Sequence, residues 1–472
     1  MTEILIKNGF IATMDAQENV YRNGSLYVKD GRIVAVGEQV EAPESPEHVI
    51  DAEHKVVLPG FVNAHAHLQQ YFRGVYELVG EFYKVNLPLE GYRLPEDMEY
   101  LGLASCAEFI YGGCTTAMVI YTYPDGFARA VSEAGNRVIL AADIEEVDLD
   151  RLGQGVYEYL PEKGEAAFER AQDLYRNWHG KAGGRITTIM APKAPDLARA
   201  GTYLRCKEFA ESRGLRLTTH LSQSWREVKQ VEKLHGKTPP QHLYDLGILN
   251  SRLTGAHCTY ATEADTQLIA DTGMGILHCR SVTNPLVRWM DMGIPVGLGT
   301  DDYHHDMLQL LRENLARQAA RARLIEGADE MLAGDRRTFR PGFYELLELA
   351  TRRGAETLGI DGDVGSLEPG KKADIITINM QNPYLMPSMD PLTSTVLYGS
   401  SRDVDTVIVD GRILKRDGAL TSLDLKQALA SAQDRVEQII GRFFLDHPDQ
   451  KKAWEHKVPY MRQPDRLAKG TC

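Results

Sequence analysis

The sequence predicts an α/β protein whose centre is a (β/α)8 TIM barrel, with a small β-sandwich module built from both chain ends. Two observations carry this prediction. The middle of the 472-residue chain alternates short apolar, β-branched runs with longer helical patterns, as repeated βα units do. Short strand patterns separated by turn signals occupy the beginning of the chain and return near its end.

The β-sandwich module is expected to comprise residues 1–55 and 362–420. Near the N-terminus, strand patterns flank Asp30-Gly31, a dipeptide typical of hairpin turns. Matching patterns return at residues 374–379 and 406–414. Strands from both ends of the chain would therefore pair in one module outside the central domain.

The barrel is expected over residues 56–361. Eight candidate strands lie in this range, at 56–63, 115–121, 137–144, 185–192, 215–222, 253–258, 274–279 and 295–301. Eight βα units are the number that closes a barrel, although periodicity alone also fits an open doubly wound sheet. Residues 421–472 are predicted to form a C-terminal helix, from Leu425 to Phe444, and a polar tail.

Composition narrows the class of protein. A net charge of −13, without a basic cluster interleaved with aromatic residues, argues against a nucleic-acid partner. The first residues contain neither a signal peptide nor a membrane-spanning length of apolar residues, so we expect a cytoplasmic protein with no membrane partner. Six scattered cysteines are expected to be buried thiols. We further expect a small-molecule substrate and a homo-oligomer.

Five residues with metal-binding side chains lie at or just beyond the C-terminal ends of four candidate strands. His65 and His67 are two residues apart, so their imidazoles lie on one face of a strand. On its own, the His-x-His pair could equally be two partly buried histidines at a strand end that bind no metal ion. His220, His257 and Asp301 occupy the corresponding place in later units, at the rim where barrels build active sites. The sequence therefore predicts a metal centre at this rim.

The order of these segments resembles the amidohydrolase superfamily. The segments are Gly60-Phe-Val-Asn-Ala-His-Ala-His, then Thr-His-Leu, Ala-His-Cys and Gly-Leu-Gly-Thr-Asp-Asp, and Gly365-Ser-Leu-Glu-Pro-Gly resembles the closing sheet module of that family. The resemblance implies that His65, His67, His220 and Asp301 bind a divalent metal ion, either Zn²⁺, Co²⁺ or Mn²⁺. Asp301 would also accept a proton from the attacking water. His257 would polarise the substrate or bind a second metal ion.

Two positions depart from the triazine hydrolase and deaminase branch of this superfamily. Gln223 stands where those enzymes usually carry a glutamate three residues beyond the third histidine, and a carboxamide cannot transfer a proton as a carboxylate does. Lys193, in Ala191-Pro-Lys-Ala-Pro, replaces a histidine. A carboxylated lysine bridging two metal ions, a free cation that stabilises oxyanion charge and a surface lysine all fit Lys193. Gln223 and Lys193 are therefore candidate catalytic residues.

A second resemblance is to phenylurea and molinate (thiocarbamate) hydrolases, and residues 69–90 and 299–306 carry it. It implies that metal-activated water cleaves an amide-like bond of a small apolar urea, carbamate or thiocarbamate. The alternative is an aminohydrolase or dechlorinase acting on an aromatic N-heterocycle, and a third hypothesis is a metal-binding barrel without catalysis. The substrate-binding candidates are Tyr76, Phe82, Tyr83, Trp225, His278, Tyr303 and His304.

Overall fold

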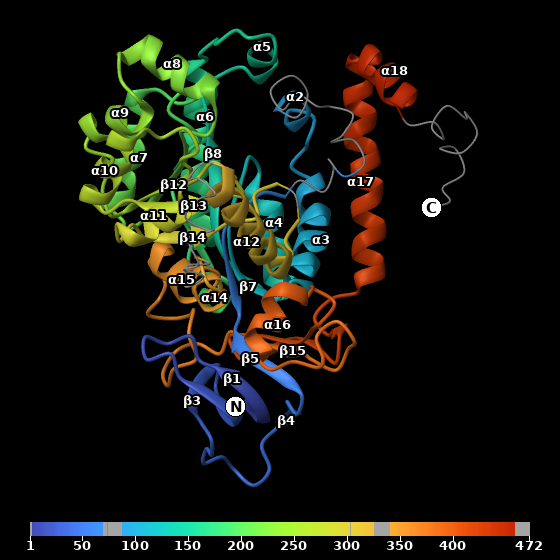
Figure 1. Ribbon diagram of the computed structural model, residues 1–472. Helices are drawn as coiled ribbons and strands as arrows, with labels where there is room; N and C mark the ends of the chain where they lie inside the picture. The colour runs from blue at the N-terminus through green and yellow to red at the C-terminus, as the bar shows by residue number, and fades with distance from the viewer. Residues whose placement is uncertain (1, 69–72, 74–86, 303, 325–339, 458–472) are drawn as a thin grey trace.

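The computed structural model describes residues 2–68, 73, 87–302, 304–324 and 340–457 (Figure 1). A β-sheet that contains the N-terminus lies at one end of the molecule, and a larger α/β domain sits on it. The long helix α17, Leu425–Asp446, runs along the side of the larger domain. None of the described helices is long and apolar enough to cross a membrane.

The terminal sheet combines strands from both ends of the chain. It has nine strands in the order β18-β17-β16-β15-β5-β1-β2-β3, with β4 paired to β1. The N-terminal strands are β1 (Glu3–Ala12), β2 (Val20–Lys29), β3 (Arg32–Gly37), β4 (His48–Asp51) and β5 (Lys55–Pro59). The later strands are β15 (Ile375–Asn379), β16 (Val404–Val409), β17 (Arg412–Arg416) and β18 (Ala419–Leu420). The antiparallel pair β15–β5 joins the two halves.

The larger domain contains parallel strands at eight positions around a barrel. The strands are β6 (Phe61–Ala66), β7 (Cys114–Tyr121), β8 (Arg137–Ile144), β9 (Ile186–Thr188) with β10 (Ala191–Pro192), β11 (Leu217–Leu221), β12 (Leu253–His257), β13 (Gly275–His278) and β14 (Val296–Leu298). They form two sheets, β6–β10 and β11–β14. Parallel bridges Met190–Leu217 and Ala66–Asp301 connect these sheets on both sides. The predicted (β/α)8 architecture is therefore confirmed.

The first predicted strand is divided in the structure. Residues 56–63 span the end of β5, which belongs to the terminal sheet, and the start of β6, the first barrel strand. Gly60 lies between them, where a Cβ atom would come within 2.1 Å of the Thr115 side chain. Because both strands are apolar and buried, the hydrophobic pattern could not show that the chain changes sheets here.

Helices connect the barrel strands and pack outside them, and further helices lie between strands of the terminal sheet and near the C-terminus (Figure 1). They are α2 (Leu87–Glu90), α3 (Asp97–Tyr111), α4 (Pro124–Ala134), α5 (Leu149–Gly153), α6 (Pro161–Trp178), the 3-10 turn η3 (Ala182–Gly184), α7 (Ala200–Glu211), α8 (Trp225–His235), α9 (Pro239–Asp245), α10 (Glu263–Thr272), α11 (Leu286–Asp291), α12 (Met307–Leu324), α14 (Phe343–Leu349), α15 (Arg352–Leu358), α16 (Pro391–Tyr398) and α18 (Pro448–Lys457). The helix predicted from Leu425 is α17, and its Arg442 binds Asp97 of α3.

Candidate metal centre and cavity

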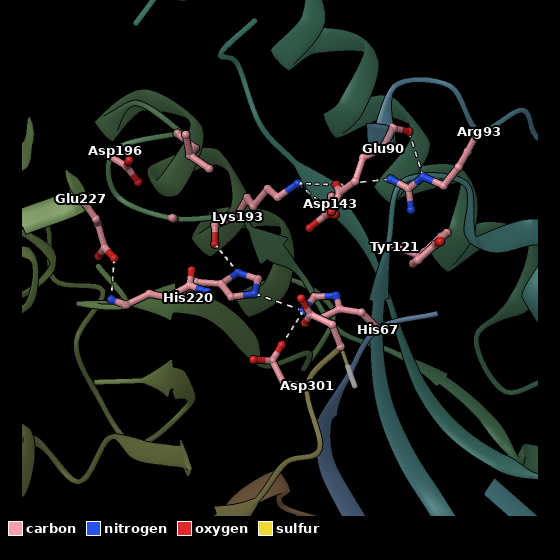
Figure 2. A pocket seen from close by; sticks show the side chains of 14 residues that line it. His67, Glu90, Arg93, Tyr121, Asp143, Lys193, Asp196, His220, Glu227 and Asp301 are labelled. Atoms are coloured by element: carbon pink, nitrogen blue, oxygen red, sulfur yellow. Dashed lines mark hydrogen bonds and ion pairs between the residues drawn. The ribbon is translucent and has the colours of Figure 1, made fainter. Parts of the chain in front are cut away.

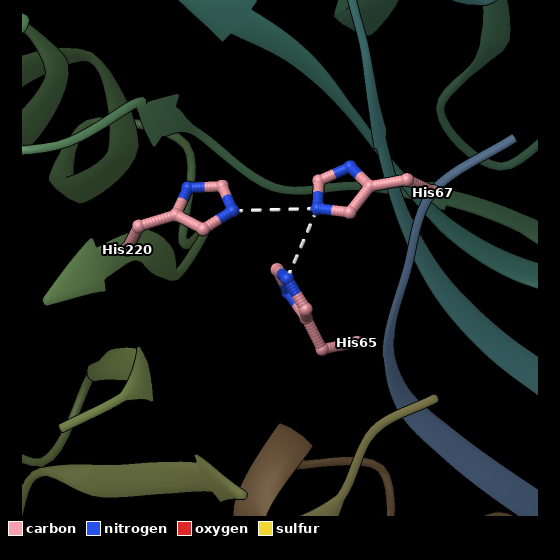
Figure 3. Close-up of side chains that lie close together, drawn as sticks. All are labelled: His65, His67 and His220. Atoms are coloured by element: carbon pink, nitrogen blue, oxygen red, sulfur yellow. Dashed lines mark hydrogen bonds between the residues drawn. The ribbon is translucent and has the colours of Figure 1, made fainter. Parts of the chain in front are cut away.

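Three histidines meet at the carboxyl ends of two barrel strands. His65 lies on β6 and His67 comes directly after the last residue of that strand, while His220 lies on β11 (Figure 3). The Nε2 atom of His67 is 3.1 Å from Nε2 of His65 and 3.3 Å from Nε2 of His220. Asp301 comes from the loop after β14, and its Oδ1 is 3.6 Å from Nε2 of His67. We call His65, His67 and His220 the histidine cluster.

This geometry fits a divalent metal ion. Two nitrogens that each lie about 2.1 Å from a zinc ion at a tetrahedral angle are about 3.4 Å apart, close to the observed separations. His67 and His220 contact backbone carbonyl oxygens of Ile120 and Lys193 through Nδ1, at 3.1 and 2.8 Å, so Nε2 is the atom left to bind the ion. Burial lowers the pKa of His65 and of His220 well below the usual value, which keeps both rings neutral, as metal ligands must be.

Asp301 is held in place by the first barrel strand. The side chain of Asn63 donates to Thr300 Oγ1 at 2.7 Å and accepts from the Thr300 backbone N–H at 3.1 Å. The backbone N–H of Asp301 donates to the carbonyl of His65. Asp301 has a φ of 60°, in the left-handed region that costs a residue other than glycine about 1 kcal/mol or more. The bonds from β6 compensate this strain and aim the carboxylate at the histidine cluster.

His257, at the end of β12, is the fifth predicted residue of the centre. Its ring centroid lies 5.6 Å from that of His220 and 5.7 Å from that of His65. The His257 Nε2 atom is buried and has no hydrogen-bond partner among the described residues. Burial lowers the pKa of His257 to about 4, so the ring is neutral. A neutral ring with one unused nitrogen beside the cluster can bind a substrate or a water molecule.

Lys193 lies on another wall of the same cavity, surrounded by carboxylates (Figure 2). Its Nζ is 2.8 Å from Glu145, 3.3 Å from Glu90 and 3.5 Å from Asp143. All four side chains are more than nine-tenths buried. Although burial opposes it, these carboxylates raise the pKa of Lys193 well above its usual value. We call these four residues the Lys193 cluster.

This environment decides among the three alternatives for Lys193. A surface lysine is excluded by its burial. Carboxylation requires a neutral amine and would place a further negative charge beside three carboxylates, so the cluster favours the ammonium form. The backbone carbonyl of Lys193 orients His220, so the residue connects the two walls of the cavity.

Gln223 lines the cavity as well, immediately after β11. Its backbone N–H and that of Ser222 each donate to the carboxylate of Glu227 at 2.7 Å. Ser224 caps helix α8 by accepting from the Glu227 N–H at 3.2 Å. Burial raises the pKa of Glu227 well above its usual value. Glu227 therefore fixes the loop that presents Gln223, a role the sequence analysis missed although Ser224-x-x-Glu227 has the spacing of a capping box.

The cavity has an empty volume of about 610 Å³. Residues that line it from both walls are His67, Glu90, Arg93, Tyr121, Asp143, Lys193, Ala194, Asp196, Leu197, His220, Gln223, Glu227, Asp301 and Asp302. Nine of these were not among the predicted site residues: the charged Glu90, Arg93, Asp143, Asp196, Glu227 and Asp302, and also Tyr121, Ala194 and Leu197. Charged and polar groups dominate the described part of the lining.

The structure describes only some of the predicted substrate-binding residues. Tyr76, Phe82, Tyr83 and Tyr303 lie outside the described residues. His278 is fully buried and does not line the described cavity, and both of its ring nitrogens contact asparagine side chains, Nε2 with Asn314 at 2.7 Å and Nδ1 with Asn284 at 3.1 Å. Its role in substrate binding stays a prediction.

Trp225 and His304 do not line the described cavity either. Trp225 is 58% exposed at the start of α8, where its ring packs on Tyr260. His304 Nε2 lies 3.2 Å from Arg280 and 3.6 Å from Glu313.

Residues 56–414 match the amidohydrolase family. A 5-methylthioadenosine/S-adenosylhomocysteine deaminase of Symbiobacterium thermophilum is 32% identical over 455 residues, which cover 93% of this chain and all of that protein. A 5′-deoxyadenosine deaminase of Methanosarcina mazei is 30% identical and covers 94% of this chain and 99% of its own.

Two solved structures show the same fold at 22% identity. An adenosine deaminase from Xanthomonas campestris with bound zinc superposes with a TM-score of 0.80, over 93% of this chain and 99% of its own. An atrazine chlorohydrolase from Arthrobacter aurescens, complexed with zinc, gives a TM-score of 0.78 over 92% of this chain and all of its own.

Proposed function

Because the chain belongs to the amidohydrolase family and is a hydrolase acting on carbon–nitrogen bonds, we propose that it is an aminohydrolase that releases ammonia from an amino-substituted nitrogen heterocycle. The relatives that match almost the whole chain are named as deaminases of adenosine derivatives, which supports this substrate class. The ureas and thiocarbamates that the sequence analysis expected as substrates find no support among these relatives.

The observation that carries the proposal is the convergence of His65, His67, His220 and Asp301 on one point, beside the unused nitrogen of His257. The cofactor is a divalent metal ion, which when bound lowers the pKa of water toward neutrality and so supplies a nucleophile at pH 7. The three histidines and the Asp301 carboxylate would hold the ion.

The remaining steps fall to the side chains of the cavity. Asp301 accepts the proton of the attacking water, because its carboxylate faces the histidine cluster. His257 donates a hydrogen bond through Nε2 to the oxygen that attacks the ring. The Gln223 side chain hydrogen-bonds a ring nitrogen without transferring a proton, so Asp301 passes the proton taken from the water to the amino group, which leaves as ammonia.

One observation favours a second candidate function. Hydrolysis of a urea or thiocarbamate requires no proton donor for a ring nitrogen, and the carboxamide of Gln223 would serve it as well as a carboxylate. The released product distinguishes the two candidates, since an aminohydrolase releases ammonia whereas a urea hydrolase releases a substituted amine.

A mixed substrate panel tests the proposal. Zn²⁺-loaded enzyme is incubated with adenosine derivatives, aminotriazines, aminopterins, N-aryl ureas and thiocarbamates, and products are identified by mass spectrometry and an ammonia assay. Asp301→Asn serves as the matched inactive control. Ammonia with a hydroxylated heterocycle is the expected result. Release of a substituted amine from the ureas or thiocarbamates alone would overturn the proposal in favour of the second candidate.

A further inference from the structure

The cavity carries far more acidic than basic side chains. Its acidic lining residues are Glu90, Asp143, Asp196, Glu227, Asp301 and Asp302, and its only Lys or Arg residues among those described are Arg93 and Lys193. Both cations are already engaged. Arg93 binds the Glu90 side chain and backbone carbonyl, and Lys193 binds three carboxylates (Figure 2). No described cation of the lining is therefore left to neutralise an anionic substrate.

Asp196 is a carboxylate of the cavity lining that belongs to neither the histidine cluster nor the Lys193 cluster. It lies beside Glu227, away from the Lys193 ammonium (Figure 2), and is only 2% exposed. Its Oδ2 accepts the Tyr157 hydroxyl at 2.6 Å. No ion pair of the described residues involves Asp196, although the charge of Arg226 favours its ionised form. The nearby Arg226 packs over the Tyr157 ring and donates to the Leu152 carbonyl instead.

An acidic side chain without a cationic partner is costly to bury. Desolvation accordingly raises the pKa of Asp196 to about 6. A hydroxyl or amino group of a bound ligand would supply the missing donor. Ala194 and Leu197, on the same loop, add apolar surface next to this carboxyl group.

We infer that Asp196 is a specificity-determining residue: it accepts a hydrogen bond from a hydroxyl or amino group on the substituent of the heterocycle, and the acidic cavity rejects substituents that carry phosphate or carboxylate. This inference rests on the proposed aminohydrolase function. It defines the substrate class as neutral or cationic amino-heterocycles with a donor-bearing substituent. A phosphate group would approach six acidic side chains with no unengaged described cation to receive it.

Three adenine compounds test the inference. Adenosine carries hydroxyl donors on its substituent, 9-methyladenine carries none, and adenosine 5′-phosphate adds negative charge. Steady-state kinetics are measured for the Zn²⁺-loaded wild type, Asp196→Ala and Asp196→Asn. Tyr157→Phe is the matched control, because it removes the hydroxyl that Asp196 binds and keeps the carboxylate.

We expect the wild type to prefer adenosine over both analogues, with kcat/KM for the phosphate at least 100-fold lower. Asp196→Ala should raise KM for adenosine about tenfold or more, with kcat changed less than threefold, and leave 9-methyladenine unaffected. Asp196→Asn, which preserves shape and one acceptor oxygen, should fall between wild type and Asp196→Ala. Circular dichroism verifies folding, and Asp196→Asn decides the matter if the alanine variant is unfolded.

Equal losses on adenosine and 9-methyladenine, or the same KM change in Tyr157→Phe, would assign Asp196 a structural role and overturn the inference. So would a wild-type enzyme that does not act on adenosine or that prefers the phosphate. Failure to release ammonia from any heterocycle of the wider panel would instead overturn the proposed function, so the two failures are distinguishable.

Discussion

The two walls of the cavity differ in how their buried titratable side chains avoid uncompensated charge. The histidine cluster consists of rings with nitrogens 3.1 and 3.3 Å apart, and the lowered pKa values of His65 and His220 keep those rings neutral. The Lys193 cluster consists of full charges that compensate one another within 3.5 Å. The first wall is complete only when a cation binds from outside, whereas the second already contains its cation. Changes in the first should therefore affect metal binding, and changes in the second should affect stability.

The largest effect is expected from His67→Ala, because His67 is the ring that contacts both of the other histidines. Removing it should reduce kcat/KM at least 1000-fold and leave the purified protein with less than one-tenth of the wild-type zinc content. Elemental analysis and an ammonia assay measure the two quantities. His48→Ala, on β4 of the terminal sheet, is the matched control and should retain both. Full activity in a zinc-free His67→Ala protein would contradict the assignment of the metal centre.

The second wall is tested by Lys193→Met, which leaves three buried carboxylates without their common cation. Breaking a buried ion pair in this way costs about 3–5 kcal/mol of unfolding free energy. Urea denaturation at pH 7.5 measures this loss. Lys207→Met breaks an exposed pair with Glu211 and should cost less than about 0.5 kcal/mol. A cost of similar size in both variants would show that the Lys193 cluster does not stabilise the fold.

The pH dependence of the Lys193→Met variant sharpens this test. Burial alone would raise the pKa of Glu145, but Lys193 and Lys163 lower it to about 2. Its contribution to stability is thus present above the ordinary value of 4.5 and is lost as the pH falls through about 2. Lys193→Met loses much of this contribution, so its deficit relative to wild type should be largest above pH 4.5 and should shrink as the pH falls from 4.5 toward 2. A deficit that is constant with pH would contradict this origin.

The two walls also differ in how far the sequence could predict them. His65 and His67 share a strand face, and His220 and Asp301 end later strands, so the pattern within each βα unit revealed the metal centre. In the Lys193 cluster, Glu90, Asp143 and Glu145 come from segments that have no common pattern. Their meeting depends on how the barrel closes, which no spacing in the sequence encodes.

Two other outcomes show the same limit. His278 ends a barrel strand, as His257 does, yet its nitrogens contact Asn284 and Asn314, of which Asn314 is 36 residues away on α12. Strand position alone could not distinguish a core histidine from a site histidine. Glu227, by contrast, follows Ser224 with the spacing of a capping box, a local signal that was available.

A smaller effect is expected from Asp196, a buried carboxyl group that belongs to neither cluster. Burial raises the pKa of Asp196 from 3.8 to about 6. The titratable groups that interact with it among the described residues are Glu227, Arg226, Tyr157, Tyr159 and Tyr203. Because the folded-state value is raised, the stability contributed by its protonated form is full below pH 3.8 and is lost as the pH rises through about 6.

Asp196→Asn removes this titration. Relative to wild type, the variant should gain about 2 kcal/mol of unfolding free energy between pH 4.5 and 7.5. Urea denaturation of both proteins at the two pH values measures the difference. Asp417→Asn, at an exposed turn of the terminal sheet, should show no such gain. Parallel stability profiles for wild type and Asp196→Asn would show that Asp196 is ionised in the fold without penalty.

The smallest effect is expected from Gln223→Glu, which places a carboxyl group on the loop after β11 without altering either cluster. The new group can protonate a ring nitrogen, and its nearness to the buried Glu227 should keep part of it protonated at neutral pH. We expect kcat for ammonia release from a heterocycle to rise about tenfold, equivalent to about 1.4 kcal/mol. Gln223→Leu, which removes the amide at similar volume, should lower it. If Gln223→Glu instead raised kcat on ureas and lowered kcat on heterocycles, the result would contradict the proposed aminohydrolase function and favour the second candidate function.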